Sequence, residues 1–302
     1  MKSFFCALSV LTALACLGFA GSAHADDVSG QVQALITKQA PAIVTVRAVL
    51  KVTTKGEGAQ TAESRTEMQG VVVDPSGLIM VSSVPFSATK MMEMMGMPSD
   101  AADSGPTITP TDFKVVFANE EKEYSAFLVA TDTTLGLTFL KIEDLAGRTP
   151  QAVTFASAPA PALGDPVYAL SRLSKGYDYA PYFSSARVSG IITKPRAAVM
   201  LDGGISDLGL PIFTATGDAA GVLTSVASGV KPEGSNEAMG MQMMMRIMGG
   251  GGGNHSGVFL VPASAVSPVI AQAQARSIQM AATRATATPD VKKPAAPAPA
   301  AK

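Results

Sequence analysis

Residues 70–80 read Gly-Val-Val-Val-Asp-Pro-Ser-Gly-Leu-Ile-Met, two apolar runs separated by a four-residue turn signal. Valine and isoleucine favour strands, whereas Asp, Pro, Ser and Gly favour a tight turn. The stretch therefore predicts a buried β-hairpin. The carboxylate of Asp74 is expected to accept a local hydrogen bond within the turn rather than to act as a catalytic acid.

The same pattern of short strands continues on both sides of this hairpin. Many short strands with regular turns favour an all-β barrel or sandwich. An amphipathic helix is expected at residues 28–39 and a closing helix at 266–279. Strands are expected at residues 43–49, 70–73, 78–81, 113–117, 126–130, 137–142, 166–170, 186–192, 211–214, 221–226 and 258–261.

The first 25 residues are typical of a secretory signal peptide. Lys2 gives a positive start, residues 4–20 are apolar, and Ala23-His24-Ala25 forms a cleavage site of the A-x-A type. We therefore expect export across the inner membrane and a periplasmic location. An uncleaved anchor is the alternative, which the short apolar run disfavours, and no later segment is apolar for long enough to span a bilayer.

Removal of this leader would change the inventory of reactive side chains. Both cysteines, Cys6 and Cys16, and one of the two histidines, His24, would be lost, leaving His255 alone. We therefore expect no disulfide, no thiol chemistry, no histidine-cluster metal site and no cofactor. A net charge of −1 without a long basic run also argues against nucleic-acid binding, which depends on phosphate neutralisation.

The composition of the mature chain predicts two structured parts and a tail. We expect an N-terminal helix and first barrel at residues 26–148, and a second barrel with the closing helix at 149–280. The second part contains a Met- and Gly-rich insert at residues 228–257. The Ala- and Pro-rich residues 281–302 are expected to be disordered, because they cannot bury enough apolar surface to fold.

Several phrases along the chain resemble, in their order, the trypsin-like serine proteases of the bacterial Deg/HtrA type. Residues 70–80 resemble the hairpin that leads to the catalytic histidine, and residues 129–142 resemble the strands around the catalytic aspartate. The resemblance covers residues 28–274 and implies a two-barrel, chymotrypsin-type fold without the PDZ domain common in that family. Further similar phrases lie at residues 163–170, 186–192, 210–213, 217–222 and 258–264.

The resemblance also implies where a Ser–His–Asp triad would lie. Val84 stands at the histidine position, Gly136 at the aspartate position and Leu208 at the serine position. These residue types cannot exchange the protons that the mechanism requires. The resemblance therefore implies a catalytically inactive homologue. The alternative is an active serine endopeptidase with a non-standard site, such as a serine paired with His255.

Eleven of the 16 methionines fall in two clusters, at residues 91–97 and 239–248. In helices, spacings of three, four and seven residues would place several of them on one face. Flexible packing in the core and an adaptable surface for peptides or unfolded chains both suit methionine. The residues expected to share such faces are Met91, Met94 and Met95 in the first cluster and Met241, Met244, Met245 and Met248 in the second.

Binding of a soft metal is a third role for the methionines. Thioethers select Cu(I) or Ag(I), and Met239, Met241, Met245 and His255 are the candidate donors. The expected function is instead a peptide- or protein-binding module in the cell envelope, which would hold an extended peptide in the barrel cleft by strand addition. The ligand or envelope partner and the oligomeric state are left open by the sequence.

Overall fold

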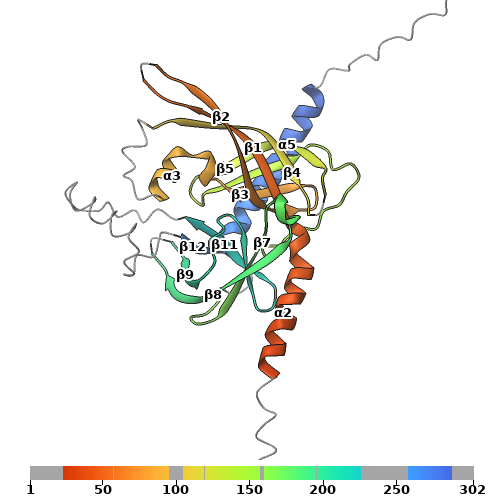
Figure 1. The fold of residues 1–302 in the computed structure, drawn as a ribbon, viewed down its shortest axis with the longest axis vertical. Coiled ribbons are helices and arrows are strands. Elements are labelled where there is room, and N and C mark those ends of the chain that lie inside the picture. Colours follow the sequence, from red (N-terminus) through yellow and green to blue (C-terminus); the bar gives the residue numbers. More distant parts are fainter. Residues whose placement is uncertain are drawn as a thin grey trace, which may run out of the picture.

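Two closed antiparallel β-barrels follow one another along the chain, as the computed structural model shows (Figure 1). The strand order is β1-β2-β3-β6-β5-β4 in the first barrel and β10-β11-β12-β9-β8-β7 in the second. The all-β, two-barrel fold expected from the sequence is confirmed. The structure describes residues 23–56, 58–94, 105–118, 120–156, 160–194, 196–225 and 258–287.

The first barrel extends the expected strands, mostly at their ends. A 3-10 turn, η2 (Val84–Phe86), and a short helix, α3 (Ala88–Met94), follow its third strand. The strands are β1 (Ile43–Thr53), β2 (Thr61–Asp74), β3 (Leu78–Ser82), β4 (Thr107–Val116), β5 (Glu123–Asp132) and β6 (Leu137–Ile142).

The second barrel contains one strand that the sequence pattern did not predict, β9 (Ala198–Gly203). Only Ala198 and Val199 are buried in this strand, so it shows no alternation of buried and exposed positions. A 3-10 turn, η4 (Lys175–Tyr177), joins the first two strands. The other strands are β7 (Pro166–Arg172), β8 (Pro181–Ile192), β10 (Pro211–Thr214), β11 (Ala219–Ser225) and β12 (Val258–Pro262).

Two longer helices flank the barrels, α2 (Ala23–Gln39) and α5 (Ala263–Ala287). Val266 and Ile270 of α5 enter an apolar cluster that also includes Leu35 of α2 and side chains from both barrels. The closing helix runs on to Ala287, so the expected start of the disordered tail at residue 281 is wrong, because this Ala-rich stretch continues the helix. None of the described helices is long and apolar enough to cross a membrane.

The β2–β3 hairpin has the turn that residues 70–80 predict. Val71 pairs with Met80 and Val72 with Ile79, and all four side chains are buried. The backbone N–H of Ser76 donates to Oδ1 of Asp74 at 2.8 Å, which confirms the expected local hydrogen bond.

The carboxyl of Asp74 has a pKa below its ordinary value. Burial raises this pKa, but hydrogen bonds from Ser76 and Gln274 and the positive charge of Lys141 outweigh the burial. The bond from Gln274 Nε2 to Asp74 Oδ2, at 2.9 Å, also ties α5 to the hairpin.

We therefore expect the Asp74→Asn variant to lose part of the pH dependence of folding. A lowered folded-state pKa means that the ionised carboxylate stabilises the fold above the unfolded pKa, about 3.9, and that this contribution disappears as the pH falls through the folded-state pKa. Because the carboxylate is only partly buried and water screens its interactions, the loss at neutral pH should be below about 1 kcal/mol. Urea unfolding between pH 7 and pH 3 measures both effects, and an unchanged acid slope would contradict the prediction.

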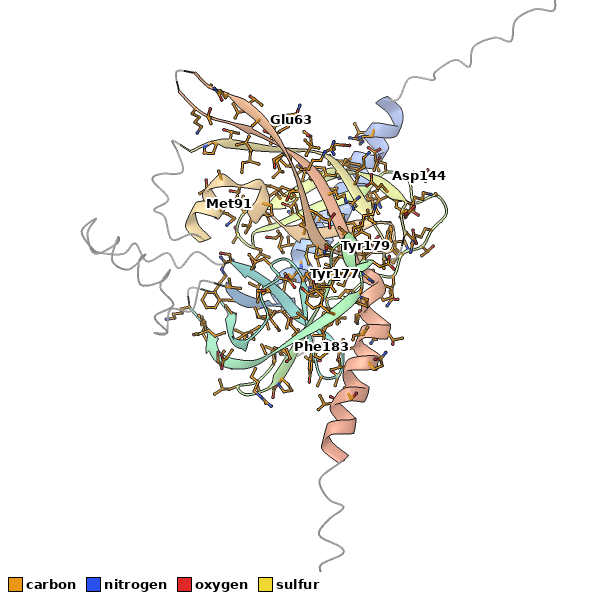
Figure 2. The ribbon with its side chains drawn as sticks, viewed as in Figure 1. Glu63, Met91, Asp144, Tyr177, Tyr179 and Phe183 are labelled. Carbon is orange, nitrogen blue, oxygen red and sulfur yellow. The ribbon has the colours of Figure 1, made fainter. Side chains whose placement is uncertain are left out.

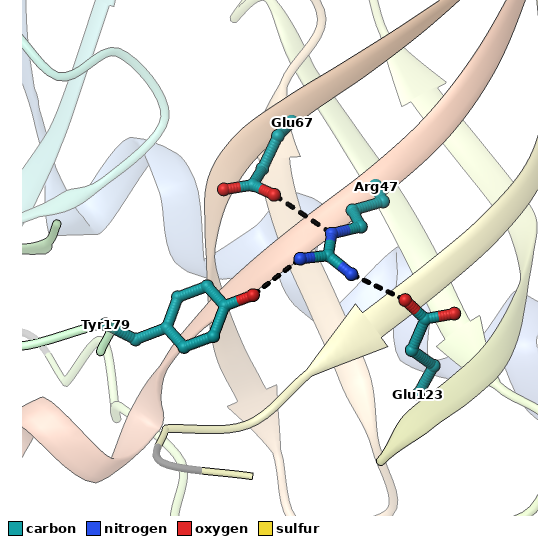
Figure 3. Close-up of polar contacts among 4 residues, drawn as sticks. All are labelled: Arg47, Glu67, Glu123 and Tyr179. Atoms are coloured by element: carbon teal, nitrogen blue, oxygen red, sulfur yellow. Dashed lines mark hydrogen bonds and ion pairs between the residues drawn. The ribbon is translucent and has the colours of Figure 1, made fainter. Parts of the chain in front are cut away.

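The side chain of Arg47 joins the two barrels. Arg47 of β1 donates to Oε2 of Glu67 at 2.9 Å, to Oε1 of Glu123 at 2.5 Å and to the hydroxyl of Tyr179 at 2.5 Å (Figure 3). Tyr179 lies between β7 and β8, so this cluster connects the outer side of the first barrel to the second. The relative position of the barrels is therefore set by specific polar contacts as well as by the shared apolar cluster.

Candidate functional site

The segment after β3 and the turn between β5 and β6 lie against each other. The N–H of Ser83 donates to the carbonyl of Gly136 at 2.8 Å, and the N–H of Val84 donates to Oγ of Ser82 at 3.3 Å. These bonds hold Val84 and Gly136 on neighbouring segments of the first barrel. Two of the three positions that the resemblance assigns to a triad are thus brought together.

The loop before β10 brings the third position to the same place. Gly209 has φ of +83°, and a Cβ on this residue would lie only 2.4 Å from the backbone N of Ser82. The N–H of Gly209 also donates to the carbonyl of Leu223 at 2.8 Å, which anchors the loop on the second barrel. Leu208 therefore lies at the junction of the two barrels, next to the end of β3.

The side chains at these three positions offer no acid, base or nucleophile. Val84 is 7% exposed, and Leu208 packs on the apolar cluster inside the second barrel. Gly136 has φ of +68° and no side chain. Within the described residues, no group of three or more His, Cys, Asp or Glu side chains could hold a metal ion.

Residues of the second barrel fix the turn that carries Gly136. The hydroxyl of Thr224 donates to the carbonyl of Leu135, and Nη1 of Arg196 donates to the carbonyl of Thr134 at 2.9 Å. Oγ1 of Thr224 would lie 3.2 Å from a Cβ on Gly136. The junction is therefore closely packed on this side.

An acidic side chain precedes Leu208 in the same loop. Oδ2 of Asp207 accepts a hydrogen bond from the hydroxyl of Tyr182 on β8 at 3.1 Å. Burial, together with the neighbouring Asp207 carboxylate, raises the pKa of Tyr182. The tyrosine therefore stays protonated and holds the carboxylate as a donor, which suits a structural role for the pair.

A small pocket of about 150 Å³ adjoins the junction on the side of the first barrel. It lies between η2, α3 and the strands β4 to β6, and Phe86 and Leu128 form apolar parts of its wall. The sequence did not single out any of its polar residues as site residues, although Ser83 stands next to the position of the expected histidine. The polar side chains that line it belong to Ser83, Ser87, Lys90, Thr131, Thr133 and Thr138.

A larger groove of about 770 Å³ lies away from this junction, between α2 and β8. Val32 and Ile36 of α2 line one side, and Phe183 of β8, which is 45% exposed, lines the other (Figure 2). None of the three triad-equivalent positions lines it. The groove therefore lies where the N-terminal helix packs on the second barrel and is not part of the junction site.

Most of the predicted methionine sites cannot be compared with the structure. Met91 lies on α3, next to Lys90, and is 42% exposed (Figure 2). Met94 ends this helix, but the placement of its side chain is not described. Met95, the cluster at residues 239–248 and His255 lie outside the described residues, as do residues 1–22 of the expected leader. The shared methionine faces and the soft-metal donors stay predictions.

Comparison with known proteins agrees with this architecture. The family model described as "Trypsin-like peptidase domain" matches residues 68–222, just over half of the chain, from β2 to β11. The chain belongs to the trypsin-like peptidase domain family. The matched region contains Val84, Gly136 and Leu208, the residues at the positions that the resemblance assigns to the triad.

The structure of the chain is also similar to the crystal structure of Deg5. The TM-score is 0.44 at 20% sequence identity, over 65% of this chain and 85% of that chain. No curated protein matches the sequence. Membership of the family therefore rests on the family model and on the two barrels themselves.

Proposed function

We propose that this protein is an exported, catalytically inactive trypsin-like peptidase homologue that binds extended peptide segments in the cell envelope. The observation that carries the proposal is the convergence of Val84, Gly136 and Leu208 at the barrel junction. A triad needs a nucleophile, a base and an orienting acid, and these three residues supply none of them. The signal peptide-like leader supports export, and the periplasm is the expected location.

The edge of β9 supports binding of an extended chain. Of the described residues of β12, only Leu260 pairs with β9, at Val199. Among the described strands, none pairs with the remaining edge of β9 from Leu201 to Gly203, which leads into the loop carrying Leu208. Backbone N–H and C=O groups on such an edge can pair with an added peptide strand.

A fluorophosphonate probe tests the catalytic part of this proposal. The probe labels activated serines, so we expect the purified mature protein to remain unlabelled under conditions that label trypsin to completion. The alternative is an active serine endopeptidase with a non-standard site. It predicts that the native protein is labelled and that the heat-unfolded protein is not. Labelling that disappears in a single Ser→Ala variant, with Ser83→Ala as the first variant to examine, would overturn the inactive assignment.

A further inference from the structure

Ser83 carries a buried hydroxyl with no hydrogen-bond partner among the described residues. The residue is 3% exposed, and it lines the small pocket beside the barrel junction. Its backbone N–H already donates to the carbonyl of Gly136. A buried hydroxyl left unpaired is unfavourable, so an acceptor placed in this pocket would stabilise it.

Lys90 brings a positive charge to the same pocket. No described carboxylate lies within ion-pair distance of its ammonium group, whereas Arg47, Arg148 and Arg284 each have an acidic partner. The nearby acid Asp132 does not line the pocket, and its Oδ1 accepts the N–H of Leu135 at 2.7 Å. Among the described residues, the pocket lining thus has one cation and several hydroxyls but no carboxylate.

The hydroxyl of Ser83 and the side chain of Lys90 both lie close to Gly136. A Cβ on Gly136 would lie 3.7 Å from Oγ of Ser83 and 3.9 Å from Cε of Lys90. A carboxylate close to this position would therefore lie within reach of both groups, while the chain itself supplies no carboxylate here.

We propose that this pocket binds a carboxylate of a bound peptide, with Lys90 as the cationic partner and Ser83 as a hydrogen-bond donor. The inference rests on the proposed peptide-binding function and names the chemical group that the site recognises. A peptide C-terminus and the side chain of Asp or Glu both supply this group. The apolar walls at Phe86 and Leu128 would contact the carbon atoms that carry it.

Size and charge favour a carboxylate over a larger anion. A volume of about 150 Å³ accommodates a carboxylate and a few further heavy atoms. Phosphate groups are typically bound by bidentate arginines or by several cations, whereas Lys90 is the single cationic side chain in the described lining. The monovalent anion therefore fits the available charge better.

An NMR titration of the isotope-labelled mature protein tests the pocket without requiring a peptide. Sodium acetate is added at constant ionic strength, with acetamide as the uncharged probe of the same shape. We expect saturable shifts of the Ser83 and Thr138 amides with acetate only, and their loss in Lys90→Met. Absence of saturable shifts, or equal shifts with acetamide or in the variant, would overturn the carboxylate pocket.

Two variants of Gly136 provide a matched internal control. Asp and Asn both tolerate positive φ and have nearly the same shape, so Gly136→Asp and Gly136→Asn differ mainly in charge. The Asp side chain would place an internal carboxylate beside Lys90 and Ser83. We expect the Asp variant to abolish the acetate shifts and the Asn variant to weaken them far less. Equal effects of the two variants would show that charge is irrelevant and would overturn the proposal.

Fluorescence anisotropy with three labelled peptides distinguishes the sources of the carboxylate. The peptides are Ala-Val-Ala-Val as the free acid, its C-terminal amide, and the amide with Glu replacing the last Ala. Charge-assisted hydrogen bonds predict about tenfold tighter binding of at least one acidic peptide than of the neutral amide, and loss of this difference in Lys90→Met. A preference for the free acid indicates a C-terminus, and a preference for the Glu peptide indicates a side chain.

The two measurements separate this inference from the proposed function. Equal binding of all three peptides, unchanged in Lys90→Met, would overturn the carboxylate pocket while peptide binding stood. Acetate binding at Lys90 without binding of any peptide would support the pocket and count against the peptide-binding function. Circular dichroism and thermal unfolding of each variant confirm that the fold is retained.

Discussion

Replacement of Arg172 by alanine is expected to lower the free energy of unfolding by about 3–5 kcal/mol. Arg172 is 6% exposed, and its guanidinium donates to the carbonyls of Ile43 at 2.8 Å, Tyr179 at 3.0 Å and Ala40. Burial lowers the pKa of this arginine, but the group remains charged. Its loss would remove hydrogen bonds to three carbonyls at the contact between the barrels, of which that of Ala40 keeps a second donor, the N–H of Ile43.

Arg187 provides the matched control for this variant. It is exposed, and its Nη1 donates to a single carbonyl, that of Gly164, at 2.9 Å. Arg187→Ala should therefore cost less than about 1 kcal/mol. Urea unfolding of both variants, followed by circular dichroism, gives the comparison. Similar losses for the two substitutions would show that the buried carbonyl contacts contribute little to joining the barrels.

Gly209→Ala is the second change with a large expected effect, a loss of about 3 kcal/mol or more. The backbone has φ of +83°, and the added Cβ would meet the N of Ser82 at 2.4 Å and its Cα at 2.9 Å. Neither atom can move away as the end of a flexible side chain could. The loop carrying Leu208 would have to leave the end of β3, so the variant should also weaken peptide binding at the junction.

Gly164→Ala separates the cost of the backbone conformation from the cost of the clash. Gly164 has φ of +87°, close to that of Gly209, and nothing lies within 4 Å of the position of its Cβ. The conformational cost alone predicts a loss of about 1–2 kcal/mol. Thermal unfolding of both variants measures the difference. A Gly209→Ala variant as stable as Gly164→Ala would contradict the close approach of the two segments.

Strands with strong local patterns could be predicted from the sequence, whereas strands that depend on their neighbours could not. The Asp-Pro-Ser-Gly turn and its flanking valines and isoleucines predict the β2–β3 hairpin because both turn chemistry and burial agree there. By contrast, β9 has only two buried positions and forms because β8 pairs along its length. Extensions such as residues 61–65 of β2 are exposed, so no apolar pattern marks them.

Some residues of the candidate site could likewise be located before the structure, and others could not. Val84, Gly136 and Leu208 were located from the resemblance, and the structure brings their segments together through the contacts of Ser83 and Gly209. Lys90 could not be singled out, because a lysine in a Met-rich stretch reads as an ordinary surface residue. Its relation to Ser83 arises from a turn between β5 and β6 that lies more than 40 residues further along the chain.

The sequence by itself determined the all-β class and the hairpin at residues 70–80, because these follow from local pattern. The triad positions came from the family resemblance, and the inactivity that we propose rests on the residue types found there. Only the tertiary structure decided which polar groups meet at the barrel junction. The unpaired hydroxyl of Ser83 and the charge of Lys90 share a pocket because barrel closure and the packing of Gly209 bring distant segments within a few ångströms. Such distances depend on long-range packing, for which a single sequence carries no local signal.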